Sequence, residues 1–249
     1  MNHLKEKAKA RQNKGSVRID KISDGDMACG FAWTWISGDQ EGLRGTTFIK
    51  LNPGTTEIEF IREIPEPIYK PGDLTLQFLQ AITKDEVIDK DILSNRSFMS
   101  QTPTVASDIA RYLYEEVQGR STSVEAMRFF SDDIVYRDFN YEDVMKGKSQ
   151  VKKFIDDFSI PGIKFVPQIF DDGYNSTCFT WEVKILDAPQ GIKGISFYEL
   201  NKATRMIRYV RDVPESAIKP PILGKLARTF RPGLGVFQSF PLGSRVEGM

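Results

Sequence analysis

The sequence predicts an α+β fold made of two copies of one unit, the first of them incomplete. Shifting the chain by 149 residues aligns Gly42–Pro71 with Gly191–Pro220 without a gap, and 12 of the 30 positions are identical, where chance gives roughly two. A shift of 148 extends the match upstream and pairs Trp33 with Trp181. Around the second copy, segments with helical spacing precede segments with strand alternation. The repeat and this order of elements together indicate the fold class.

The second unit is expected over residues 105–215, and it opens with helices. Ser107–Gln118 has apolar residues at helical spacing after a serine suited to cap the helix. Thr122–Phe130 begins with a threonine and a glutamate three residues apart, as in a capping box. Met145–Phe158 is the third helix, and a proline and a glycine follow soon after its end. Asp133–Phe139 is expected to form a short turn or strand.

Four strands are predicted after the helices of the second unit. They are expected at Ile163–Phe170, Thr177–Leu186, Gly194–Leu200 and Arg205–Val213. In the second of these strands, Phe179, Trp181 and Val183 alternate with other residues, so they point to one face. Short connections between strands favour antiparallel pairing, and therefore a curved antiparallel sheet.

The first unit is expected over residues 1–83, with its strands in Val17–Ile64 and a terminal helix at Gly72–Thr83. The segment Lys5–Gln12 is interpreted as a remnant of the third helix, and the first two helices have no counterpart. The first copy is therefore either truncated or a surviving half domain. A polar linker at residues 84–104 is expected between the units.

Composition argues against several classes of function. Lysine plus arginine and aspartate plus glutamate both number 34, so no net charge attracts nucleic acid. The apolar runs are too short to span a membrane. His3 is the one histidine and lies in a lysine-rich leader, so histidine-based triads and zinc sites are not expected. Cys29 and Cys178 are interpreted as small buried residues, while a disulfide between the copies stays open.

Four segments carry a family resemblance: Phe129–Tyr136, Gly147–Val151, Gly194–Leu200 and Ile207–Asp212. The chain resembles the nuclear-transport-factor-two-like fold, and within it the SnoaL-like polyketide-cyclase group, over residues 105–215 and, in half, over 15–66. The resemblance implies two cone-shaped units of curved antiparallel sheet with packed helices, the first lacking its N-terminal helices. It also implies that the interior of the cone holds a small apolar ligand.

A catalytic role for Asp212 follows from the same resemblance. In SnoaL-like enzymes an acidic residue at the end of the last long strand acts as the base, and Asp212 matches that position. A carboxyl group against apolar walls has a raised pKa, as a base near neutrality requires. The residues expected to line the cavity are Tyr136, Asp138, Trp181, Tyr198 and Tyr209.

Each of these residues also has a structural interpretation. Asp212 is able to pair with a neighbouring arginine such as Arg211, and Glu63 keeps the negative charge in the first copy. The repetition of Trp33 as Trp181 favours packing, because both copies need a core equally. Neither interpretation involves a metal site.

The C-terminal arm at residues 216–249 is both basic and apolar. It is expected either to dock on a partner or membrane surface or to strap onto its own domain. The residues expected to dock are Lys225, Arg228, Phe230, Arg231 and Phe237. The segment 211–234 looks like plastid proteins of the same group from plants and algae. That resemblance implies the chloroplast stroma or the stromal face of the thylakoid, with the transit peptide absent from this chain; the cytoplasm is the alternative.

The function favoured by these patterns is a non-enzymatic binding or accessory protein of a plastid assembly. A photosystem or antenna complex, and hence a thylakoid assembly, is the expected partner. The alternatives are a small isomerase or cyclase, or a carrier of an apolar ligand, using the cavity of the second unit. No cofactor is predicted, and a pigment or lipid is the candidate ligand of an open cavity.

Overall fold

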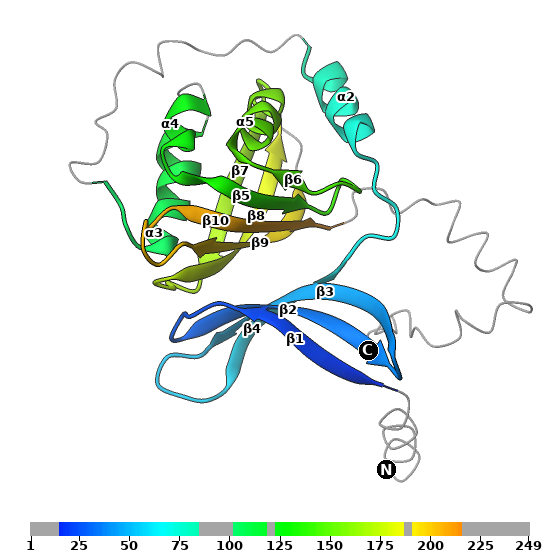
Figure 1. Cartoon of the computed structure of the whole chain (residues 1–249), viewed down its shortest axis with the longest axis vertical. Helices are drawn as coiled ribbons and strands as arrows, with labels where there is room; N and C mark the ends of the chain where they lie inside the picture. The colour runs from blue at the N-terminus through cyan, green and yellow to red at the C-terminus, as the bar shows by residue number, and fades with distance from the viewer. Residues whose placement is uncertain (1–14, 85–101, 119–122, 187–190, 216–249) are drawn as a thin grey trace, which may run out of the picture. The chain divides into compact units, whose positions relative to one another are not determined.

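The computed structural model describes residues 15–84, 102–118, 123–186 and 191–215. These residues form an α+β fold with two curved sheets and several short helices, and all of them belong to one compact unit (Figure 1). The leader, most of the predicted linker and the C-terminal arm lie outside the described residues.

The first sheet has four antiparallel strands in the order β1-β2-β3-β4. The strands are β1 (Ser16–Ile22), β2 (Ala28–Ser37), β3 (Gln40–Leu51) and β4 (Ile58–Pro65). They fall within the segment predicted for the strands of the first unit. The helix predicted after them is present as α2 (Asp73–Ile82).

The second unit opens with a helix that differs in detail from the prediction. α3 (Ala106–Arg111) continues without a break as the π-helical η1 (Tyr112–Val117). Ser107 is not the N-cap, because it lies inside the helix. The backbone N–H groups of Ala106 and Ser107 donate to the carbonyl oxygens of Tyr174 and Gly173, at 3.0 and 3.1 Å. The loop before β8 therefore caps this helix, and no side-chain cap is needed.

The other two helices are shorter than predicted. α4 (Ser123–Met127) ends before Phe130, which begins a strand, and α5 (Lys148–Asp157) starts after Met145 and Lys146, which form the short strand β6. Strand pairing at both places replaces helical hydrogen bonds, so tertiary context overrides the local helical pattern.

The second sheet has six strands in the order β6-β5-β10-β9-β8-β7. The strands are β5 (Phe130–Asp138), β6 (Met145–Lys146), β7 (Ile163–Phe170), β8 (Ser176–Ile185), β9 (Ile192–Leu200) and β10 (Ile207–Pro214). All neighbours pair antiparallel except β10 and β5, which are parallel. The parallel pair brings the first and last strands of the unit side by side in the middle of the sheet.

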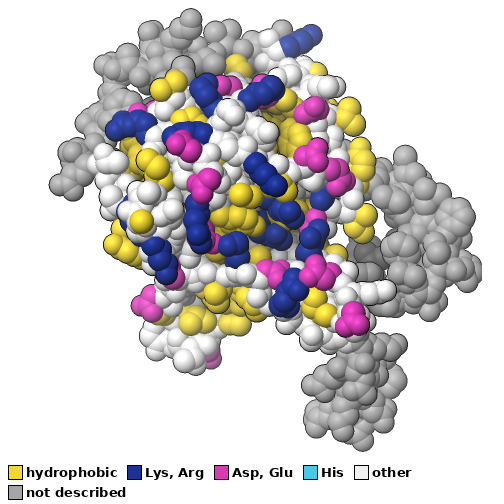
Figure 2. Space-filling view, viewed as in Figure 1, with side chains coloured by type: hydrophobic (Ala, Val, Ile, Leu, Met, Phe, Trp, Pro, Cys, Tyr) yellow, Lys and Arg dark blue, Asp and Glu magenta, His cyan; other side chains and the backbone are white. Residues whose placement is uncertain are grey.

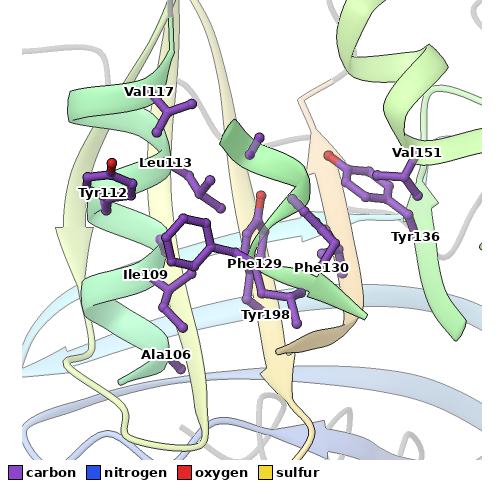
Figure 3. Close-up of a cluster of buried hydrophobic side chains, with 14 of the residues drawn as sticks. Ala106, Ile109, Tyr112, Leu113, Val117, Phe129, Phe130, Tyr136, Val151 and Tyr198 are labelled. Atoms are coloured by element: carbon purple, nitrogen blue, oxygen red, sulfur yellow. The ribbon is translucent and has the colours of Figure 1, made fainter. Parts of the chain in front are cut away.

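Helices cover one face of the six-stranded sheet, here called the inner face. Its side chains, among them Phe179, Trp181 and Tyr198, form one core cluster with α3, η1, α4 and α5. Figure 3 shows Tyr198 and Phe129 within this cluster, beside the helix that carries Leu113. The inner face is thus closed by packed side chains.

The outer face of the same sheet packs against the four-stranded sheet. Residues at alternate strand positions, such as Phe197 and Val213, share a second core cluster with Phe48 and Ile64 of the first sheet. The buried Arg211 guanidinium adds polar contacts, since it donates to Thr46 Oγ1 at 2.8 Å and to the Gly45 carbonyl oxygen at 3.3 Å. The face of the molecule seen in Figure 2 carries interspersed positive and negative charges with hydrophobic side chains between them.

Candidate functional site

The inner face brings together most of the residues that the sequence suggested for a site. Asp212 lies on β10, Tyr136 on the neighbouring β5, Tyr198 on β9 and Trp181 on β8. All four side chains are buried, and Figure 3 shows Tyr136 and Tyr198 among the hydrophobic side chains of the core. Asp138 follows Tyr136 by two residues, and the register places it beside Asp212.

Tyr209 is separated from this group by the sheet. Because successive side chains of a strand point to opposite faces, Tyr209 lies on the outer face when Asp212 lies on the inner one. It packs against Phe197 with ring centroids 6.3 Å apart, and Lys21 Nζ lies 4.4 Å from the centre of its ring. The sequence already indicated this separation, because positions 209 and 212 are an odd number of residues apart on one strand.

A chain of hydrogen bonds crosses four adjacent strands on the inner face. Trp181 Nε1 donates to Ser196 Oγ at 2.7 Å, and the Ser196 hydroxyl donates to Asp212 Oδ1 at 2.5 Å. The Tyr136 hydroxyl donates to the other carboxylate oxygen, Asp212 Oδ2. Both oxygens of the carboxylate therefore already have a donor within the protein.

The register of β8 and β9 makes room for this chain. Gly194 lies opposite Trp181, and a Cβ atom on Gly194 would stand 2.0 Å from Cζ2 of the indole ring. Only glycine lets the ring lie flat across β9, which directs its N–H towards Ser196. Ser196 in turn lies opposite Asp212 in the β9–β10 pair.

Burial sets the protonation of the carboxyl groups. It raises the pKa of Asp212 to about 6, against the hydrogen bonds from Ser196 and Tyr136, which lower it. Burial also raises the pKa of Asp138 to about 7, and the charge of Asp212 adds to this, while the Asn140 N–H opposes it. Both carboxyl groups therefore have pKa values nearer to neutrality than a free aspartate, in the range that general acid–base chemistry uses.

Two members of this cluster escaped prediction from the sequence. Ser196 links Trp181 to Asp212, and Tyr114 of η1 lies with its hydroxyl 3.1 Å from that of Tyr198. Burial raises the pKa of Tyr114 and Tyr198 above the usual value, so both phenols stay protonated. The sequence contained one indication of the role of Ser196: its repeat partner, Thr47, also carries a hydroxyl group.

The four-stranded sheet contains the same motif. Trp33 Nε1 donates to Thr47 Oγ1 at 3.0 Å, and the Thr47 hydroxyl donates to Glu63 Oε2 at 3.1 Å. These residues precede Trp181, Ser196 and Asp212 by 148, 149 and 149 positions. Gly45 has the role of Gly194, since its Cβ would lie 2.4 Å from the Trp33 ring. Here, however, the carboxylate is exposed and no tyrosine is bonded to it among the described residues.

The remaining candidates do not join the cluster. Cys29 and Cys178 are free thiols whose pKa is raised by burial, so no disulfide joins the sheets. In the part of the chain that the structure describes, no three His, Cys, Asp or Glu side chains gather as metal ligands would. Among the same residues, no helix is long and apolar enough to cross a membrane. The predicted docking residues, from Lys225 to Phe237, lie outside the described ranges.

No protein-family model and no curated protein matches the chain. Among solved structures, it is similar to a protein of the SnoaL-like family from Agrobacterium tumefaciens, with 18% identity over 44% of this chain and 96% of that chain, at a TM-score of 0.38. An NTF2-like protein of unknown function from Cytophaga hutchinsonii has 12% identity over 47% of this chain and 94% of that chain, at a TM-score of 0.37. An epoxide hydrolase/cyclase-like enzyme of pyran ring formation in salinomycin has 14% identity over 44% of this chain and 90% of that chain, at a TM-score of 0.36. At these identities and TM-scores, the likenesses concern the fold and assign neither a family nor an activity to this chain.

Proposed function

We propose that the protein is a non-enzymatic binding or accessory protein, and that its buried polar cluster stabilises the fold. The observation that carries the proposal is that the two oxygens of Asp212 are both occupied by donors from the protein's own core. Each oxygen keeps a second lone pair, but a general base must also reach its substrate, and Asp212 is only 7% exposed. The surrounding side chains of Tyr136, Trp181 and Tyr198 are 3 to 5% exposed, so they occupy the interior themselves.

The repeated motif supports the same proposal. Trp33, Thr47 and Glu63 form the tryptophan–hydroxyl–carboxylate chain on a sheet that no described helix encloses. A motif that recurs where no enclosed site exists is explained by sheet packing, because it satisfies the indole N–H in both sheets. The shared motif also supports descent of the two sheets from one duplicated unit.

Replacing the hydroxyl in each sheet tests the structural role. Ser196→Ala leaves the Trp181 N–H and one Asp212 oxygen unpaired in the core, so we expect it to lower the free energy of unfolding by about 2–3 kcal/mol. Thr47→Val is the matched variant, and we expect a smaller loss of about 1–2 kcal/mol, because it leaves the buried Trp33 N–H unpaired but water still reaches the exposed Glu63. Urea unfolding monitored by circular dichroism measures both. A Ser196→Ala variant as stable as the wild type would contradict the structural role.

The partner proposed for this accessory function is a thylakoid assembly in a plastid. It rests on the resemblance of residues 211–234 to plastid proteins and on the mixed basic and apolar character of the arm at 216–249. The test is to purify the tagged chain from its source cells without detergent and to follow its co-elution with thylakoid complexes. A variant with Lys225, Arg228 and Arg231 changed to Glu should lose the co-elution. The charge-matched control, with Lys152, Lys153 and Lys202 changed to Glu, should keep it, and a free monomer in the stroma would contradict the proposal.

A second candidate function is acid–base catalysis on, or carriage of, a small apolar molecule inside the second unit. The observation that favours it is the pair of neighbouring carboxyl groups with pKa values of about 6 for Asp212 and about 7 for Asp138. It requires a substrate to displace core side chains. Native mass spectrometry of protein from source cells discriminates, since a bound small molecule that is lost in Tyr198→Trp favours this function over the first.

A further inference from the structure

The four-stranded sheet has an apolar face that points away from the six-stranded sheet, here called the open face. Its apolar residues are Val17, Ile19, Phe31, Trp33, Trp35, Ile49 and Ile61, and Thr47 and Glu63 lie on the same face. The register sets Val17 opposite Trp35, Ile19 opposite Trp33 and Ile49 opposite Ile61, so they share one side. Phe48 and Ile64, at alternate positions, face the other sheet. Val17, Ile19, Trp35 and Ile61 are exposed, Ile61 by 58%, whereas Trp33 is 9% exposed.

The repeat indicates what kind of element fits the open face. Val210 is the repeat partner of Ile61 and is fully buried, and Val183 is the partner of Trp35 and is 5% exposed. Both lie in the core cluster that joins the six-stranded sheet to its helices, such as α3. The same face of the same kind of sheet is thus covered by amphipathic helices in one unit and exposed in the other. An apolar helix is therefore the complementary element.

The chain also presents an unpartnered apolar helix. Leu74, Phe78 and Ile82 of α2 follow each other at intervals of four residues and are 60, 62 and 40% exposed, so they form one stripe along the helix, here called the helix stripe. The adjacent side of α2 is anchored, because Leu79 is buried and Thr75 Oγ1 donates to Asn140 Oδ1 at 3.1 Å.

The anchor keeps α2 on its own six-stranded unit. Gly72, just before the helix, donates its N–H to the Asn140 carbonyl oxygen at 2.8 Å, in addition to the Thr75 bond. Within one chain, the helix stripe and the open face are consequently both exposed. α2 carries a single charged residue, Asp73, so its docking on an apolar surface desolvates little charge.

We propose that the chain forms a two-fold symmetric dimer in which the helix stripe of each copy covers the open face of the other. A two-fold arrangement satisfies both surfaces at once and closes the assembly, because each copy gives one helix and receives one. The packing reproduces, between chains, the helix-on-sheet contact that the second unit makes within the chain. It leaves the outer face of the six-stranded sheet free for the four-stranded sheet that occupies it.

Sedimentation velocity of the full chain over a range of concentrations tests the dimer. We expect a monomer–dimer equilibrium. Its dissociation constant should rise at least tenfold in Ile61→Glu, on the open face, and in Phe78→Glu, on the helix stripe. The reason is that burying the new carboxylate in the interface costs roughly 1.4 kcal/mol or more. Val124→Glu, at a side chain that is 61% exposed on α4, is the control and should dimerise like the wild type. Circular dichroism and urea unfolding check that each variant is folded.

Mixing the two variants gives the decisive result. Neither Ile61→Glu nor Phe78→Glu alone has an intact pair of helix stripe and open face, whereas a heterodimer of the two has one. We therefore expect the mixture to associate more tightly than either variant alone. A wild type that stays monomeric at every concentration, variants that dimerise normally, or a mixture that gains no association would each overturn the proposal. Loss of the dimer in Ile61→Glu but not in Phe78→Glu would overturn the assignment of α2 as the occupant.

Discussion

Gly194 and Trp181 are a pair in which a single missing Cβ atom decides the packing. The Trp181 ring is 4% exposed and bonded to Ser196, so it has no room to move away from position 194. The ring lies over the backbone of the neighbouring strand, where any side chain at position 194 would overlap it. A methyl group there is consequently an overpacking substitution rather than a change in backbone freedom.

Gly194→Ala should therefore lower the free energy of unfolding by about 2–3 kcal/mol. Urea unfolding followed by tryptophan fluorescence measures the loss. Gly42→Ala is the control, because the nearest atom to its added Cβ, on the Trp35 ring, is 3.4 Å away and the expected change is within about 0.5 kcal/mol. Equal effects at the two glycines would show that the ring contact is not responsible.

Asp212 is a carboxyl group whose burial in the core disfavours its charged form. Its folded pKa, about 6, is above the value near 3.8 of a free aspartate, so the folded state binds more protons than the unfolded state between these values. Stability therefore falls as the pH rises from about 4 to about 6, by about 1.4 kcal/mol for each unit of pKa difference. The hydrogen bonds from Ser196 and Tyr136 limit this loss.

Asp212→Asn removes the ionisation and should flatten this pH dependence. We expect the variant to gain stability relative to the wild type as the pH rises from about 4 to about 6, and the difference to level off above that range. Urea unfolding at several pH values, with Asp172→Asn at an exposed carboxylate as control, measures the trend. A difference that is constant with pH would mean that Asp212 has an ordinary pKa.

At the scale of elements, the loop between β1 and β2 fastens one sheet to the other. Asp24 accepts hydrogen bonds from the backbone N–H groups of Asn175 and Ser176 at 3.0 and 2.9 Å, and from both of their side chains. Burial raises the pKa of Asp24, but these donors outweigh it and hold the pKa below its usual value. The carboxylate thus stabilises the folded state above the pKa of the unfolded chain, and this contribution is lost as the pH falls through the folded pKa.

Asp24→Ala should lower the free energy of unfolding by about 1–3 kcal/mol at neutral pH, because it leaves backbone donors of the β7–β8 loop unpaired. The loss should shrink as the solution is acidified below about pH 4, because the unfolded chain then binds a proton that the folded carboxylate binds only at a lower pH. Asp172→Asn is the control: this repeat partner forms an ion pair with Arg111 and is 72% exposed, and asparagine tolerates its left-handed backbone (φ 60°), so little change is expected. Thermal unfolding at pH 7 and pH 3 measures both variants.

At the scale of the whole molecule, the two sheets share one core. Phe48 and Ile64 lie in the same cluster as Phe197 and Val213, which are their repeat partners at a spacing of 149. A Cβ on Gly30 would likewise lie 2.0 Å from Cys178 Sγ, its partner at a spacing of 148. Contact between equivalent residues is the property of a two-fold interface. The first sheet therefore meets the second as one protomer of a symmetric dimer would meet the other.

Such an interface should make the sheets unfold together. The chain has three tryptophans, and Trp181 alone lies in the six-stranded sheet. In a Trp181→Phe variant, the fluorescence comes from Trp33 and Trp35 and reports on the first sheet. In a double variant with Trp33→Phe and Trp35→Phe, it comes from Trp181 and reports on the second sheet. We expect fluorescence and circular dichroism to give one coincident urea transition within each variant. Separate transitions within either variant would show that the first sheet folds as an independent domain.

Prediction from the sequence succeeded where a pattern is local. Period-two alternation located the strand that contains Phe179 and Trp181, and helical spacing located the helix around Leu113. It was wrong about Ser107 as a cap, because the N–H groups of Ala106 and Ser107 donate to carbonyl groups 68 and 66 residues away in sequence. It missed Tyr114, whose partner Tyr198 is set by how a π-helical turn meets β9.

The sequence by itself determined the α+β class and the repeat that pairs Trp33 with Trp181 and Glu63 with Asp212. These features depend on residues close together along the chain or on direct comparison of two segments. Only the tertiary structure decided that both Asp212 oxygens are bonded, that β10 pairs parallel with β5 and that one sheet face stays open. The physical reason is that strand register and helix coverage are non-local: they fix which side chains meet and which stay exposed, and no periodicity within a segment encodes that choice.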